Sequence, residues 1–125
     1  MMTFERAVAS VHTVNRDSTK LGRFCWTKVG SSRKNMHVTT MYMPHNKDNT
    51  DTKKHMVRDQ HKTHYTSKGM VNKEPCCTLF EDVVEKCVSW EQEGCEIVLV
   101  GDFNEDIHRG KFSERLAKDD LNMLE

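Results

Sequence analysis

The residues best suited to chemistry form a short loop, Gly101-Asp102-Phe103-Asn104, directly after the apolar run of residues 97–100. The glycine permits a sharp backbone turn, and α/β sheets expose ligands just beyond the carboxyl ends of their strands. The Asp102 carboxylate can orient or deprotonate a water molecule or lie near a divalent metal, and the Asn104 amide can donate to a phosphoryl oxygen. The spacing is therefore compatible with phosphate chemistry. It is also compatible with a structural turn in which both side chains bond to local backbone amides.

Other candidate groups are weaker. A zinc site could be drawn from two histidines and two cysteines, namely His61, His64, Cys76 and Cys77. Adjacent cysteines are poor joint tetrahedral ligands, however, and the chain has no Cys-x2-Cys pair. A nucleophilic Cys–His pair stays open, but no local motif singles one out, so Cys87 and Cys95 are interpreted as core residues. Trp26 and Trp90 are interpreted as packing residues rather than base-stacking platforms.

The loop needs a strand and a packed helix to position it. Residues 96–100 form a continuous apolar, β-branched run, which predicts a strand covered on both faces. Upstream, residues 78–81 (Thr-Leu-Phe-Glu) match a capping box and predict the start of an amphipathic helix that ends at Gly94. Beyond the loop, Ser113 is predicted to cap a short helix through Ala117. Its expected core contacts are Leu116, Leu121 and Leu124.

The first part of the chain predicts a β-hairpin. Residues 22–29 and 36–43 are rich in β-favouring side chains, and Pro44 stops the second strand. Residues 16–20 indicate a turn. Apolar spacings of three and four predict helices over residues 4–14 and 53–65. The order of these elements predicts an α/β fold.

Composition limits the protein to one small domain. The chain has 125 residues, of which 36% are hydrophobic and 30% charged, with no apolar run long enough for a membrane span. The N-terminal residues lack a signal-peptide pattern, and five cysteines suit reduced thiols, so an intracellular location is expected. Residues 1–72 carry 13 Lys+Arg against 5 Asp+Glu, and residues 73–125 carry 6 against 14. The basic half could attract phosphate, or the two halves could attract each other.

The loop and its context together resemble a known superfamily. The string Ile-Val-Leu-Val-Gly-Asp-Phe-Asn, the amphipathic helix before it and the earlier strand ending Met41-Tyr42-Met43-Pro44 resemble the endonuclease/exonuclease/phosphatase superfamily, which has the DNase I-like fold. Residues 22–26, 60–65 and 90–107 look most similar to endonuclease domains of retroelement-like reading frames. The resemblance implies that Asp102 handles the attacking water, that Asn104 holds the phosphate and that Tyr42 contacts it. The resemblance also implies a Mg²⁺-dependent phosphodiester hydrolase that acts on nucleic acid, with DNA preferred to RNA. A nuclear location would be compatible with such an enzyme.

The resemblance is incomplete. The family uses an upstream metal-binding glutamate and a downstream Asp-His pair, and neither can be placed: Glu5 is too near the hairpin, and His108 is not preceded by aspartate. We therefore expect residues 1–125 to form a partial four-layer α/β sandwich, with mixed β-sheets and outer helices, truncated at both ends and weakly active or inactive. The alternative is a non-catalytic retroelement remnant or binding module. Exposed sheet edges and an exposed apolar face predict self-association.

Overall fold

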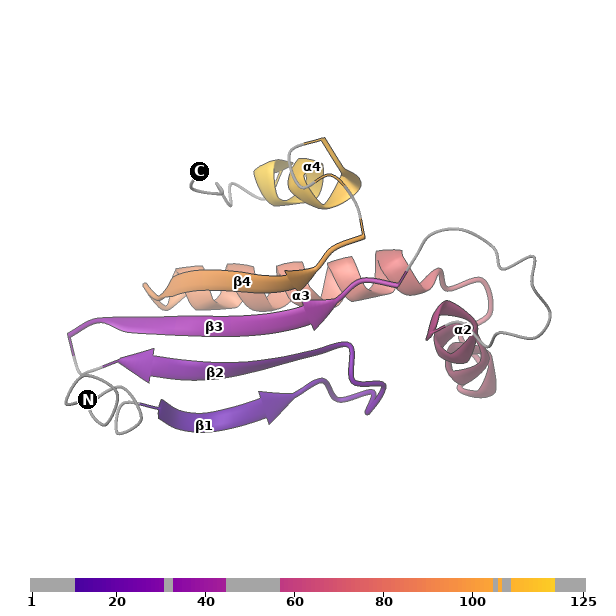
Figure 1. The fold of residues 1–125 in the computed structure, drawn as a ribbon, viewed down its shortest axis with the longest axis horizontal. Coiled ribbons are helices and arrows are strands. Elements are labelled where there is room, and N and C mark those ends of the chain that lie inside the picture. The colour runs from indigo at the N-terminus through magenta and orange to yellow at the C-terminus, as the bar shows by residue number, and fades with distance from the viewer. Residues whose placement is uncertain (1–10, 31–32, 45–56, 105, 107–108, 119–125) are drawn as a thin grey trace.

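The computed structural model describes residues 11–30, 33–44, 57–104, 106 and 109–118 (Figure 1). Its elements, in chain order, are β1 (Val11–Arg16), β2 (Phe24–Gly30), β3 (Asn35–Tyr42), α2 (Val57–Ser67), α3 (Pro75–Gln92), β4 (Glu96–Asp102) and α4 (Lys111–Lys118). The α/β prediction is confirmed. None of the helices in the described ranges is both long and apolar enough to cross a membrane.

The four strands form one mixed sheet in the order β1-β2-β3-β4. Strands β1, β2 and β3 pair antiparallel, so the predicted β-hairpin over residues 22–43 is confirmed. Strand β4 pairs parallel with β3, and the connection between them contains α2 and α3. The described residues contain this single sheet, and a four-layer sandwich therefore stays a prediction.

Helix α3 packs on one face of the sheet and builds the core. Figure 1 shows α3 running behind the sheet along β4. Its buried side chains meet the inward-facing residues of the strands in one hydrophobic cluster, which includes Leu79, Val83, Cys87 and Trp90 from α3, Phe24 and Met41 from the strands, and the partly buried Trp26, Ile97 and Leu99. The core roles predicted for Cys87 and Trp90 are confirmed, because both are buried within this cluster. Burial of these side chains supplies the main hydrophobic stabilisation of the sheet.

The opposite face of the sheet is open in the described part of the chain. Val98 and Val100 on β4 are 38% and 53% exposed, whereas Ile97 and Leu99, which alternate with them, pack against the core. The prediction that this strand is covered on both faces is therefore wrong for the described residues. A β-branched apolar run favours a strand whether one or both of its faces are buried, so the run alone could not separate the two cases.

Helix α3 begins earlier than its sequence suggested. Its first residue is Pro75, which suits a first helical position because its fixed φ matches the helix and its missing N–H needs no partner there. Thr78 lies inside the helix, and its hydroxyl donates to the Glu74 carbonyl at 3.0 Å. The capping-box prediction is therefore wrong. The predicted end is confirmed, since Gly94 follows the helix with φ of +76°.

Two further helix predictions have mixed outcomes. Residues 11–14 belong to β1 and pair with β2, so the helix predicted over residues 4–14 is wrong there, and residues 4–10 lie outside the described ranges. Pairing with a neighbouring strand outweighs a short amphipathic pattern. Helix α2 confirms the predicted helix from Val57 onward, while residues 53–56 lie outside the described part.

Helix α4 also starts before its predicted cap. It begins at Lys111, and Ser113 lies within its first turn, where its hydroxyl donates to the Gly110 carbonyl at 2.9 Å. Leu116 is buried as predicted. Leu121 and Leu124 fall outside the described residues.

Candidate functional site

The structure brings two of the three predicted site residues side by side. Tyr42 ends β3 and Asp102 ends β4, and they occupy paired positions in the parallel register of these strands. Because side chains alternate along paired strands, both lie on the open face with Val98 and Val100. Tyr42 is 38% exposed and Asp102 is also exposed. The carboxyl ends of β3 and β4 therefore present a phenol and a carboxylate together.

Gly101 allows the two strands to come this close. A Cβ at this position would lie 1.9 Å from the Met41 carbonyl oxygen, a distance that no side chain can occupy. Its φ of +159° adds to the preference for glycine. Immediately beyond, the Met43 N–H donates to the Asp102 carbonyl at 2.8 Å and continues the pairing. The glycine is thus required by strand packing, independently of any catalytic role.

Asn104 is held by local hydrogen bonds. Its backbone N–H donates to Asp102 Oδ1 at 3.0 Å, and its side-chain Nδ2 donates to the Met43 carbonyl oxygen. Its φ of +47° lies in the left-handed region, which asparagine tolerates better than most residues. The Asx-type turn considered from the sequence is therefore present. It anchors the loop to β3 and leaves Asp102 Oδ2 without a hydrogen bond from the described residues.

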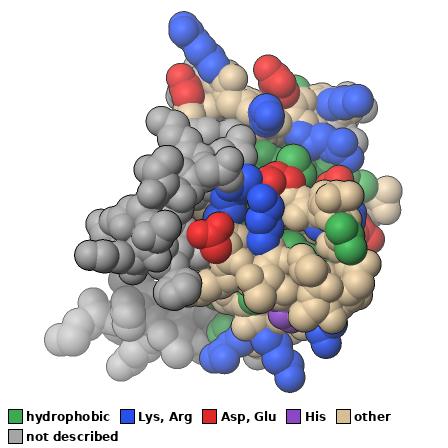
Figure 2. All heavy atoms as spheres, turned by 90° about the vertical axis from the view of Figure 1, so that its right-hand side faces the viewer, with side chains coloured by type: hydrophobic (Ala, Val, Ile, Leu, Met, Phe, Trp, Pro, Cys, Tyr) green, Lys and Arg blue, Asp and Glu red, His purple; other side chains and the backbone are tan. Residues whose placement is uncertain are grey.

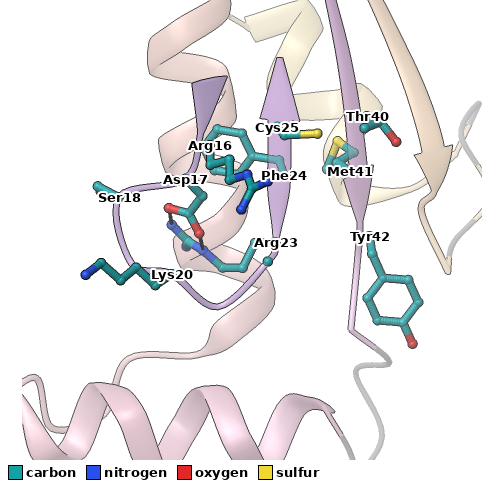
Figure 3. Close-up of a pocket in the computed structure, with 11 residues that line it drawn as sticks. Arg16, Asp17, Ser18, Lys20, Arg23, Phe24, Cys25, Thr40, Met41 and Tyr42 are labelled. Atoms are coloured by element: carbon teal, nitrogen blue, oxygen red, sulfur yellow. Dashed lines mark hydrogen bonds and ion pairs between the residues drawn. The ribbon is translucent and has the colours of Figure 1, made fainter. Parts of the chain in front are cut away.

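An open hollow adjoins Tyr42 (Figure 3). Its volume is about 770 Å³, and its polar lining includes Arg16, Asp17, Ser18, Lys20 and Arg23. Tyr42 lines one side of it, and in Figure 3 its ring points away from the Asp17–Arg23 pair. Asp102 and Asn104 do not line this hollow. The three predicted site residues are therefore near one another, and of the three only Tyr42 lines this hollow.

The inner wall of the hollow is a buried charge network that the sequence did not predict. Arg23, 1% exposed, donates to Asp17 at 2.5 and 2.7 Å, to the Tyr65 hydroxyl at 2.9 Å and to Asp82 at 2.5 Å. Burial raises the pKa of Asp17, but its hydrogen bonds to Arg23 and Thr19 outweigh burial and hold it below the usual value. The available signal was an aspartate within the predicted turn of residues 16–20 and an arginine just after it. Their partners in two helices could not be read from that signal.

The opposite charges of the two halves of the chain meet in ion pairs. Arg23 pairs with Asp82 at 2.5 Å, Arg58 with Glu74 at 2.8 Å and Lys34 with Glu96 at 2.8 Å. Figure 2, which views the end of the molecule where β3 and β4 finish, shows basic and acidic side chains interspersed on the described surface. The two halves therefore attract each other, as one of the two sequence interpretations expected.

No cluster of ligand side chains marks a magnesium site at Asp102 in the described part of the chain. Mg²⁺ prefers oxygen ligands in octahedral geometry, usually one or two carboxylates with waters and substrate phosphates. Among the described residues, no group of three potential ligand side chains includes Asp102. His61, His64, Cys76 and Cys77 do not form such a group either. A Mg²⁺ requirement therefore stays a prediction for the part of the chain that the structure describes.

The described residues do contain one group of three potential metal ligands, His37, Glu93 and Cys95, at the other end of the sheet. Comparison of the chain with protein-family models, with curated proteins and with solved structures finds no match.

Proposed function

We propose that the chain binds and hydrolyses a phosphodiester at the carboxyl ends of β3 and β4, and that its substrate is DNA. The observation that best supports this proposal is the register pairing of Tyr42 with Asp102 on an exposed sheet face. The proposal also rests on the resemblance of the Gly101–Asn104 loop to the endonuclease/exonuclease/phosphatase superfamily. Within that proposal the DNase I-like sandwich remains the expected parent fold.

Each side chain has a role that its surroundings permit. Asp102 Oδ1 accepts the Asn104 N–H, which fixes the carboxylate, and Oδ2 is available to accept a proton from the attacking water. The Tyr42 hydroxyl can donate to a phosphoryl oxygen. Arg16 and Lys20, both exposed at the hollow beside Tyr42, supply positive charge for the neighbouring phosphates.

A non-catalytic binding module is the second candidate. The observation that favours it is the set of hydrogen bonds that already engage Asn104, one to Asp102 Oδ1 and one to the Met43 carbonyl. In that case Asp102 and Asn104 shape the loop, and the cations beside Tyr42 bind phosphate without cleavage. Both candidates predict salt-dependent DNA binding.

A plasmid-nicking assay in Mg²⁺ buffer separates the two candidates. Catalysis predicts that Asp102→Ala lowers the nicking rate by at least about 100-fold, the usual loss when a positioned proton acceptor is removed. Glu91→Gln, an exposed change on α3, is the matched control and should retain the wild-type rate. Nicking that survives Asp102→Ala would remove the catalytic assignment. DNA binding without nicking by the wild-type chain would establish the binding module instead.

The role of Tyr42 is tested by the affinity for DNA rather than by the nicking rate. Tyr42→Phe removes a single hydroxyl from an exposed side chain and should weaken oligonucleotide affinity roughly 3- to 10-fold, the value of one hydrogen bond. Fluorescence anisotropy with a labelled duplex measures this change. Equal affinities of the two proteins would exclude contact between the hydroxyl and phosphate.

A further inference from the structure

A buried histidine near the start of β3 lacks hydrogen-bond partners among the residues that the structure describes. His37 lies on β3, on the face covered by α3, and is 6% exposed. Its ring stacks on Trp90 with centroids 4.3 Å apart and an interplanar angle of 6°. Neither ring nitrogen has a hydrogen-bond partner among the described residues. A buried imidazole normally bonds through at least one nitrogen, so stacking alone does not account for this side chain.

Two further ligand-type side chains converge on this histidine. Glu93 caps the end of α3, and Cys95 lies two residues later, just before β4. One ligand atom from each of His37, Glu93 and Cys95 lies within 4.8 Å of the other two. Gly94, with φ of +76°, turns the chain between Glu93 and Cys95, and the Cys95 N–H donates to the Trp90 carbonyl at 3.0 Å. The turn after α3 therefore presents the carboxylate and the thiol to a strand that lies more than 50 residues earlier in the chain.

We propose that His37, Glu93 and Cys95 form a binding site for one Zn²⁺ ion, with water as the fourth ligand. Imidazole nitrogen, thiolate sulfur and carboxylate oxygen are the three ligand types that proteins use for zinc. Thiolate disfavours Mg²⁺ and Ca²⁺, which take oxygen ligands. Bound zinc would join the end of α3 to β3 and satisfy one His37 nitrogen. When it binds, the Cys95 thiol releases its proton to solvent.

The geometry needs only small side-chain movements. Tetrahedral zinc with ordinary bond lengths places its ligand atoms about 3.4 to 3.6 Å from one another. The three atoms are within 4.8 Å, so they must close by little more than about 1 Å. Glu93 is exposed and can supply most of this movement by rotation about its side-chain bonds. His37 is buried and Cys95 packs against the core, so both have less freedom to move than Glu93.

The charges around His37 suit a neutral imidazole. Burial lowers its pKa, the Lys28 ammonium lowers it further, and only the Glu93 carboxylate raises it. A neutral imidazole is the form that binds metal. Lys28 on β2 lies opposite His37 on β3 in the strand register. Its positive charge repels a bound cation, so Lys28→Gln should increase the affinity for zinc.

Cobalt spectroscopy on the reduced, metal-free chain of residues 1–125 tests this site. Co²⁺ occupies zinc sites, and a cysteine thiolate ligand produces a sulfur-to-cobalt charge-transfer absorption. We expect one Co²⁺ per chain, that absorption, and its loss when Zn²⁺ displaces the cobalt. Cys95→Ser should abolish the absorption, whereas Cys77→Ser, at an exposed position of α3, should leave it unchanged. No charge-transfer band in the wild-type chain, or a band that persists in Cys95→Ser, would overturn the proposal.

Glu93→Gln provides a test that does not depend on a buried substitution. Glu93 is exposed, so the variant should fold normally, which circular dichroism checks. We expect zinc affinity measured by calorimetry to fall at least about tenfold, the lower end of the losses seen when groups that support a metal are removed. Affinity equal to that of the wild type would remove Glu93 from the site and refute the three-ligand proposal. Asp102→Ala should bind zinc as the wild type does, so the test is independent of the proposed phosphodiester chemistry.

Discussion

Replacing Arg23 with methionine should be among the most destabilising single changes in this protein. The guanidinium is buried and donates to Asp17, Tyr65 and Asp82, with the closest contacts at 2.5 Å. Methionine retains the apolar stem but leaves Asp17, whose side chain is 2% exposed, without its countercharge. Removing one partner of a buried ion pair costs about 3 to 5 kcal/mol, a large part of the roughly 5 to 15 kcal/mol that stabilises a typical domain.

Urea unfolding followed by circular dichroism measures this loss and its cause. Arg23→Met and Asp17→Asn should each destabilise the protein, and the double variant should lose less than the sum, because it no longer buries an unpaired charge. Lys34→Gln provides the control, because its pair with Glu96 is 74% and 58% exposed and its loss should leave the unfolding midpoint unchanged. An Arg23→Met variant as stable as the wild type, or strictly additive losses, would refute the assignment of this energy to the ion pair.

The Asp17–Arg23 ion pair predicts that the folded protein loses stability in acid. The pKa of Asp17 is below 3.8 in the folded protein, so the unfolded chain takes up this proton at a higher pH than the folded chain does. The stability that the Asp17 carboxylate contributes is therefore fully present above the pKa of the unfolded chain. It is lost as pH falls from that pKa through the lower pKa of the folded protein. Asp17→Asn should flatten the stability profile in this acidic range, and a profile parallel to the wild type would contradict the argument.

Three further changes test other parts of the structure. His61 is 2% exposed, and burial lowers its pKa below 6.5. The unfolded chain therefore takes up this proton first as pH falls, so the free energy of unfolding should decrease as pH falls through 6.5 and below. Urea midpoints should show a smaller decrease in His61→Gln. Gly101→Ala should lower the free energy of unfolding by roughly 2 kcal/mol or more, because the new Cβ would meet the Met41 carbonyl. Gly94→Ala has open space around it and should lower that free energy by about 1 kcal/mol. Equal losses of the two variants in thermal unfolding would contradict this. Val100→Lys, at a 53% exposed position, should reduce concentration-dependent association in sedimentation velocity, and unchanged association would exclude the open face as its origin.

Local patterns predicted the elements that depend on neighbouring residues. The hairpin, the Gly94 helix end and the strand before Asp102 follow from alternation and turn residues that act within a few positions. The start of α3 was missed because two plausible starts lie close together, and the proline at 75 outweighed the threonine at 78. A short-range pattern identifies an element more reliably than it identifies the element's first residue.

The sites depend on contacts that no local pattern contains. Arg23 meets Tyr65 across 42 positions and Asp82 across 59, and its burial is possible only because both partners arrive there. The His37, Glu93 and Cys95 group likewise requires the parallel register of β3 and β4, which places the turn after α3 beside the start of β3. Asp102 and Asn104 were visible because their chemistry lies within one loop. Tyr42 was proposed from resemblance, and the register supplies its physical link to Asp102.

The open sheet face couples two of the proposals. Tyr42 and Asp102 lie on the same face as Val98 and Val100, so any partner that covers the valines also removes water from the phenol and the carboxylate. If self-association buries this face, the associated form covers the proposed phosphate site and should bind DNA more weakly than the monomer does. Binding equilibria that share a surface are reciprocal, so an oligonucleotide that occupies the site must shift the protein towards the monomer by the same factor. A duplex that binds with no effect on association would place the two events on different surfaces.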